Sequence, residues 1–281
     1  MSGALITAPW QIEMNGLLMG ATTDYVVRAF DPWAMPVVRT SDSQFAGQHG
    51  VRPGADWLGE RAVAVSILIR PSTDAVEQAA RRTLAGAWRP ITSQARVGLW
   101  WMEDDGNKYV LFGKPRATGS TVAPTLPTEA RFLATDPRIY SASLKTLSAG
   151  LPTVSGGLSF PASAPFVFGS AGSGGSIAAT NDGTIEAPYV AVFTGPLVAP
   201  TLTHTGQART LSLSGASLAA GETLVLDSAA RTVLLNGSSS RFSWLSSLSQ
   251  WFTLEPGANA LQFNAASGSG SCQVAFRDAW L

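Results

Sequence analysis

The stretch from Gly221 to Phe263 constrains the fold more than any other part of the chain. Two apolar runs rich in β-branched and aliphatic residues, Thr223–Leu226 and Thr232–Leu235, flank a short polar connection. This pattern predicts a β-hairpin. Asn236-Gly237 follows directly and predicts a tight turn, because both residues tolerate positive φ.

The second half of this stretch repeats the pattern. The apolar run Trp251–Leu254 is followed by Pro256-Gly257, and proline and glycine suit the two central positions of a turn. Leu261–Phe263 then predicts a further strand. No side chain here is of a type or spacing that points to catalysis, so the stretch predicts a β-sandwich.

The composition agrees with a turn-rich β protein. The 281 residues suffice for one large or two modest domains, and they include 28 Gly and 17 Pro. With 45% hydrophobic and 14% charged residues, the chain is too apolar for a disordered protein. Lys plus Arg equals Asp plus Glu, at 19 each, which argues against sequence-specific nucleic-acid binding.

The chain carries one cysteine, Cys272, so it forms no internal disulfide. The first ten residues lack a basic segment followed by a long apolar one, and we expect no signal peptide. No apolar run is long enough to insert into a membrane. We therefore expect synthesis in the cytoplasm.

The N-terminal half predicts several strands around one helix. Arg61–Arg70 is the strongest strand, apolar on both faces late in its run, and we expect it in the sheet interior. Helical spacing of apolar residues continues from Asp74 to about Leu84, with Gly86 as the expected stop. Gln94–Met102 and Lys108–Gly113 predict a hairpin.

The polar, glycine-rich segment Val38–Asp56 predicts a long loop. Loops of this length in compact domains usually have a function or lie against a partner. Phe45, Arg52 and Trp57 are candidate inter-subunit contacts, because aromatic residues and arginine are favoured as interface anchors. The alternative is that Trp57 is a core residue and the loop is a surface excursion.

The charge-free segment Leu151–Pro165, rich in Ser, Gly and Pro, predicts a linker. We therefore expect two domains, residues 1–150 and 151–281. The first is mainly β and resembles a sandwich with one inserted α-helix. The second has many short strands and no helix, which predicts a β-sandwich of the jelly-roll kind.

Several motifs together resemble the distal tail (Dit-like) proteins of siphophages, also called minor tail proteins. The C-terminal motifs are a hairpin ending in Leu-Asn-Gly, the pattern Trp-Phe-x-Leu-x-Pro-Gly-x-Asn-x-Leu-x-Phe from Trp251, and the ending Phe276–Trp280. In the N-terminal half, Gly47–Gly50, the long strand before the single helix, and Asp136–Tyr140 fit the same family. Each motif is weak alone, and their order carries the resemblance.

This resemblance implies a structural virion protein at the tail tip. Proteins of this family have an N-terminal domain that forms a ring, usually of six copies, and a galectin-like C-terminal domain. The ring joins the tail tube protein to the tail-tip hub or baseplate, anchors receptor-binding proteins and lets DNA pass through its lumen. The implied partners are copies of itself, these proteins and the tape measure protein.

The residues that could carry chemistry do not form a recognisable catalytic or metal-binding pattern. His49 has no spaced His or Cys partner for zinc, and His204 has no evident triad partners. Glu103-Asp104-Asp105 could suggest paired carboxylates, but it lies in a predicted turn, where acidic side chains are usually solvated. We expect no enzyme activity, cofactor or metal.

The sequence also supports an alternative function. A galectin-like sandwich can bind glycans on an exposed tryptophan, and Trp244 lies in the polar context Arg-Phe-Ser-Trp-Leu-Ser-Ser. Trp251 and Trp280 lie in apolar strand patterns and are expected to pack inward. The alternative is therefore a carbohydrate-binding module that contacts the host surface through Trp244.

Overall fold

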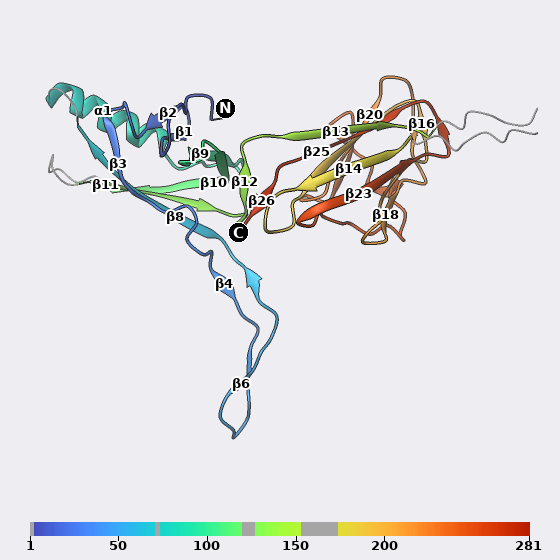
Figure 1. Cartoon of the computed structure of the whole chain (residues 1–281), viewed down its shortest axis with the longest axis horizontal. Coiled ribbons are helices and arrows are strands. Elements are labelled where there is room, and N and C mark those ends of the chain that lie inside the picture. Colours follow the sequence, from blue (N-terminus) through green and yellow to red (C-terminus); the bar gives the residue numbers. More distant parts are fainter. Residues whose placement is uncertain (1–2, 71–73, 120–126, 153–173) are drawn as a thin grey trace, which may run out of the picture. The chain divides into compact units, whose positions relative to one another are not determined.

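The computed structural model describes residues 3–70, 74–119, 127–152 and 174–281, which form two compact units (Figure 1). The first unit comprises Met1–Ser143 together with Trp280–Leu281, and the second comprises Leu144–Ala279. Thus the last two residues return to the first unit. Residues 153–173, which hold most of the predicted linker, lie outside the described residues.

The first unit is built on one antiparallel sheet in the order β2-β1-β9-β10-β11-β8-β3. Its strands are β1 (Ile12–Met14), β2 (Leu17–Met19), β3 (Tyr25–Phe30), β8 (Arg61–Ile69), β9 (Val97–Met102), β10 (Lys108–Thr118), β11 (Thr128–Ala134), β12 (Ile139–Ser141) and β26 (Ala279–Trp280). As predicted, β8 lies inside the sheet, between β11 and β3, and its last five residues are buried. The hairpin of β9 and β10 is also confirmed.

One α-helix, α1 (Asp74–Ala87), connects β8 to β9 in this unit. Leu84 and the following Trp88 are buried in a core shared with strands of the sheet. The helix continues one residue past the expected stop at Gly86, and the Asn15 side chain donates a hydrogen bond of 2.6 Å to the carbonyl of the last helical residue, Ala87. That bond satisfies a helix-terminal carbonyl that would otherwise need a cap.

The described residues of the second unit form three sheets. The strand orders are β13-β25-β15-β20-β21-β22, β14-β23-β17-β18 and β19-β16-β24. Their bounds are β13 (Lys145–Gly150), β14 (Ser176–Asn181), β15 (Tyr189–Thr194), β16 (Leu197–Val198), β17 (Thr201–His204), β18 (Arg209–Ser212), β19 (Ser217–Leu218), β20 (Thr223–Asp227), β21 (Thr232–Leu235), β22 (Ser239–Ser240), β23 (Gly257–Asn264), β24 (Ser267–Gly268) and β25 (Ser271–Phe276). A short 3-10 helix, η1 (Phe242–Trp244), follows β22.

The two larger sheets of this unit pack as a β-sandwich. Burial alternates along β14 and β15, so each strand turns one row of side chains inward. Phe193 of β15 and Phe263 of β23 meet across the interior with ring centroids 5.6 Å apart.

The predicted mainly-β fold class is therefore confirmed. β13 precedes the boundary expected at residue 150, yet it pairs with β25 and lies in the second unit.

The turn predicted at Asn236-Gly237 forms, but the turn predicted at Pro256-Gly257 and one predicted strand do not. Pro256 lies in a bend, and Gly257 already begins β23. Asn236 and Gly237 both have positive φ, 50° and 71°, in the turn after β21. By contrast, Trp251–Leu254 forms only an isolated bridge between Leu254 and Ala187. Phe252 and Leu254 are buried. The apolar residues of this segment therefore pack in the core, although the segment forms no strand ladder.

The single thiol provides a test of the sandwich core. Cys272 is fully buried in β25, and burial raises its pKa from 9.0 to about 12. We expect it to resist thiol reagents in the folded protein at pH 9, where an unfolded chain would react readily. The raised pKa also means that this group stabilises the fold fully below pH 9 and progressively less as pH rises toward 12. Rapid labelling without denaturant would contradict this burial.

Candidate interaction surface

The segment predicted as a loop forms a hairpin arm, which we define as residues 37–59. It projects from the first unit between β3 and β8 (Figure 1). β4 (Val38–Arg39) pairs with β7 (Trp57–Leu58) near its root, and β5 (Ser43–Gln44) pairs with β6 (Val51–Arg52) near its tip. The Asp42 carboxylate joins the two ladders by accepting a 2.8 Å hydrogen bond from the backbone N–H of Gly54.

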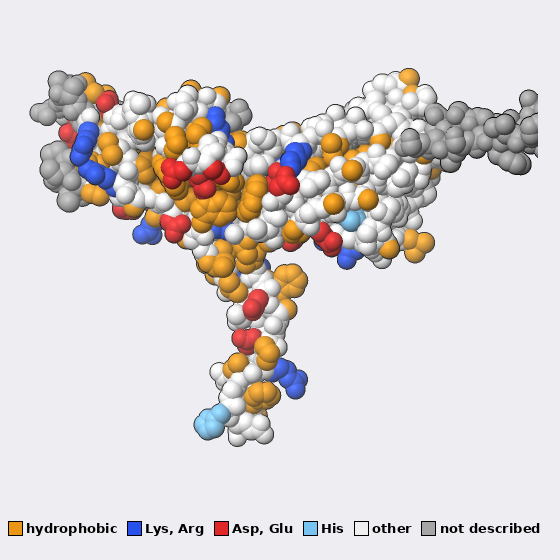
Figure 2. Space-filling view, in the orientation of Figure 1, with side chains coloured by type: hydrophobic (Ala, Val, Ile, Leu, Met, Phe, Trp, Pro, Cys, Tyr) orange, Lys and Arg blue, Asp and Glu red, His pale blue; other side chains and the backbone are white. Residues whose placement is uncertain are grey.

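The arm has no core of its own. Every residue from 37 to 57 is exposed, and Figure 2 shows hydrophobic side chains along its length. Its large exposed hydrophobic side chains are Val37, Val38, Phe45, Val51 and Trp57. A two-stranded hairpin is marginally stable in water by itself, and exposed apolar side chains gathered on one segment are typical of an interaction site.

The structure places all three candidate contact residues on this arm. Trp57 is 65% exposed, which excludes the core alternative. Phe45 lies in the tip segment that connects β5 to β6, and Arg52 is paired with Ser43 in the tip ladder. Their contact with another subunit stays a prediction.

Arg61 anchors the root of the arm and was not recognised from the sequence. Its side chain is fully buried at the start of β8. The guanidinium donates to the carbonyls of Pro32 (3.1 Å), Ala34 (2.6 Å) and Pro137 (2.8 Å). Burial lowers its pKa from the usual value, and Asp31 offsets part of that shift. Arg61 therefore joins the chain that enters the arm to the body of the first unit.

The acidic turn after β9, Glu103-Asp104-Asp105, accepts hydrogen bonds from tryptophan side chains. The Glu103 carboxylate accepts hydrogen bonds from the indole N–H groups of Trp33 and Trp101, and Asp104 accepts one of 2.8 Å from Trp10. The expectation that these carboxylates are merely solvated was therefore wrong for Glu103, which is half-buried against two indoles, whereas Asp104 and Asp105 are exposed. The missed signal was long-range, because Trp10 and Trp33 lie far from the turn in sequence. Figure 2 shows acidic side chains beside a broad hydrophobic patch in this unit.

The two histidines have different environments. His49 is exposed at the arm tip. His204 is buried, and its Nδ1 accepts a 3.1 Å hydrogen bond from the backbone N–H of Gln207. Its Nε2 therefore carries the proton that is donated to the side-chain oxygen of Asn259, 2.9 Å away. This arrangement ties two turns of the sandwich together and uses both ring nitrogens.

Trp244, the candidate glycan contact, is half-buried in η1. The Arg241 guanidinium lies over its ring, 5.4 Å from the centroid. A Cβ added at Gly215 would lie 3.2 Å from the indole Cδ1, so the backbone there lies close to the ring. Glycan contact through Trp244 stays a prediction.

Within the described ranges, no group of three or more His, Cys, Asp and Glu side chains is placed to hold a metal ion. No helix in the described part of the chain is long and apolar enough to cross a membrane.

Comparison with known proteins points to phage tails. Residues 182–280 match the family model described as Siphovirus-type tail component, C-terminal domain. No curated protein sequence matches the chain.

Two of the solved structures that share the fold come from phages. One is the Dit protein (gp 19.1) of phage SPP1, described as a paradigm of the hub adsorption apparatus in phages that infect Gram-positive bacteria. It matches with a TM-score of 0.69 at 12% identity, over 98% of this chain and 100% of the other. The other is the baseplate of phage P2 in its activated conformation with Ca, with a TM-score of 0.52 at 8% identity, covering 95% of this chain and 97% of that one.

The resemblance to siphophage distal tail proteins is therefore confirmed: the chain is similar to that family in sequence over residues 182–280, and it shares the fold of SPP1 Dit over nearly its whole length.

Proposed function

We propose that this chain is a non-enzymatic structural protein of the siphophage tail tip. Copies of it form a ring, six in number as the family resemblance implies, that joins the tail tube protein to the tail-tip hub. The ring anchors receptor-binding proteins and lets DNA pass through its lumen. The family match over residues 182–280 carries the proposal, and the coreless arm supports it.

The arm supplies one half of the contact between neighbouring copies. A closed cyclic ring uses heterologous interfaces, so each copy needs two different surfaces. Phe45, Arg52 and Trp57 project from the arm without packing into their own unit, as interface anchors must. The glycan-binding alternative gains no support from Trp244, whose ring is overlaid by Arg241.

Alanine substitution on the arm tests this function. We expect native mass spectrometry to show a multimer of the unchanged protein, and negative-stain images to show a ring. The triple variant F45A/R52A/W57A should be monomeric, because each lost anchor weakens an interface by about 2 kcal/mol, roughly thirtyfold in Kd.

A matched control shows whether loss of the multimer is specific to the arm or follows from removing any exposed apolar side chain. Leu248 is 87% exposed in the second unit, and Leu248→Ala should leave the multimer intact. Protection of Cys272 from thiol reagents reports that the second unit of each variant is still folded. A chain that stays monomeric at all concentrations, even with the tail tube protein present, would disprove the proposed ring.

A further inference from the structure

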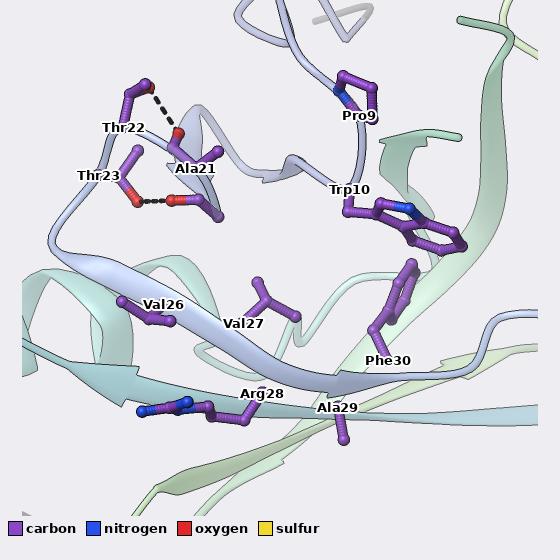
Figure 3. Close-up of a pocket in the computed structure, with 11 residues that line it drawn as sticks. Pro9, Trp10, Ala21, Thr22, Thr23, Val26, Val27, Arg28, Ala29 and Phe30 are labelled. Atoms are coloured by element: carbon purple, nitrogen blue, oxygen red, sulfur yellow. Dashed lines mark hydrogen bonds between the residues drawn. The ribbon is translucent and has the colours of Figure 1, made fainter. Parts of the chain in front are cut away.

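A groove beside β3 is the strongest unassigned surface of the first unit. It has a volume of about 380 Å³ and lies between β3 and the segments that precede it. Figure 3 shows Trp10, Val27 and Phe30 on facing sides of this gap. β3 is the last strand of the sheet and, among the described strands, pairs only with β8, so its other edge borders the groove. Edge strands of this kind readily accept a further chain segment.

Two residues that line the groove have strained backbone conformations. Trp10 and Thr22, which both line it, have positive φ of 59° and 69°, a conformation that bulky or β-branched residues rarely adopt. Trp10 is kept there by a 2.7 Å backbone hydrogen bond to Met102 and by its indole bond to Asp104, yet 42% of it remains exposed. Strain that is maintained at an exposed aromatic residue is typical of a binding site.

The chemistry of the groove matches the outer half of the arm. Residues 43–53 contain Phe45, Val51 and Arg52 and no acidic residue. The Trp10 end of the groove combines aromatic rings with the carboxylate of Asp104. Arg28 also lines the groove, and Figure 3 shows its side chain on the opposite side of the β3 ribbon from Val27. An apolar, basic segment is therefore the complementary occupant.

The arm of the same copy cannot be that occupant. Eight extended residues separate Val37 from Phe45, which places the tip roughly 25 Å from the root. The root itself is fixed by Arg61 and by the bond from Trp33 to Glu103.

We propose that the groove lined by Trp10, Val27 and Phe30 receives the arm tip of a second copy of this chain, with Phe45 in the groove and Arg52 beside Asp104. This inference rests on the proposed self-assembly and assigns the second of the two surfaces that a heterologous ring needs. It also makes the assembly head-to-tail, because arm and groove are different surfaces of one unit.

Engineered cysteines test the contact directly. The native thiol, Cys272, is buried and therefore does not compete in disulfide formation. Ala21 lines the groove and Ala46 follows Phe45, and both are exposed. Under mild oxidation, the double variant A21C/A46C should give a ladder of covalent oligomers on a non-reducing gel. Each single variant should give at most dimers. The control A46C/A85C places the second thiol at an exposed position of α1 and should give no ladder.

Two results would overturn the inference, and they separate it from the proposed function. If A21C/A46C gives no ladder, or the control gives an equal one, while the unchanged protein still assembles, the receiving site is wrong and the ring proposal survives. If the unchanged protein does not assemble and no ladder forms, both fail.

A charge reversal on the arm provides a second measurement that leaves the groove unchanged. In the A21C/A46C background, Arg52→Asp should slow ladder formation roughly twofold to fivefold, whereas Arg52→Lys, which keeps the charge, should not. An unchanged rate with Arg52→Asp would exclude the pairing of Arg52 with Asp104.

Discussion

Replacing Arg61 with alanine is expected to lower the free energy of unfolding of the first unit by about 3 to 5 kcal/mol. The change removes the donor for the carbonyls of Pro32, Ala34 and Pro137 and leaves a cavity at the start of β8. The bond to Pro32 is buried, and a buried carbonyl left without a donor costs about 1 to 3 kcal/mol, whereas the part-buried carbonyls of Ala34 and Pro137 cost less. Arg61→Lys should recover only part of the loss, because an ammonium group cannot span the same three carbonyls.

Urea unfolding followed by tryptophan fluorescence measures this effect. Of the nine tryptophans, only Trp244 and Trp251 lie in the second unit, so the signal reports mainly the first. Arg82 is exposed on α1, and Arg82→Ala should change stability by no more than about 0.5 kcal/mol. If Arg61→Ala is equally mild, the buried guanidinium does not hold the arm root.

Replacing Lys145 with methionine is expected to destabilise the second unit by about 3 kcal/mol. The Lys145 ammonium lies 2.7 Å from a carboxylate oxygen of Asp278 and 2.6 Å from one of Asp182, and it also donates to the carbonyl of Thr180. The Asp278 side chain is only 8% exposed, so without the lysine it is a buried charge with no counter-ion, held only by a 3.0 Å hydrogen bond from the backbone N–H of Asp182. The double variant K145M/D278N should therefore be more stable than Lys145→Met alone.

The pH dependence of this cluster has a definite sign. Burial by itself would lower the pKa of Lys145, but the hydrogen bonds to Asp182 and Asp278 outweigh it, and the pKa is raised above 10.5. The contribution of Lys145 is therefore fully present below pH 10.5 and is lost as the pH rises above that value. Labelling of Cys272 in increasing urea follows the second unit. No coupling between Lys145→Met and Asp278→Asn in a double-mutant cycle would contradict the pairing.

Local signals predicted the sandwich well because its turns and strands are specified by neighbouring residues. The Asn236-Gly237 pair predicts a turn with positive φ at both positions, and both residues have positive φ in the structure. The apolar faces of β20 and β21 likewise follow from alternation along the chain. The family resemblance could be recognised from the sequence because it also rests on short local motifs.

The arm and its root could not be predicted because they depend on contacts between distant residues. The two ladders of the arm are two residues long and lie in a polar segment, so no periodicity distinguishes them from a loop. Nothing near Arg61 shows that its guanidinium is buried. The role of Glu103 depends on Trp33, 70 residues away in sequence.

The return of the chain end to the first unit has a consequence for the order of synthesis. Trp280 belongs to that unit and packs edge-on against Tyr109, with ring centroids 5.4 Å apart. The first unit therefore combines residues from both sides of the second unit in the sequence, and it is complete only after the whole second unit has been made. A chain truncated anywhere within the second unit would lack this aromatic contact and leave the core of the first unit without Trp280.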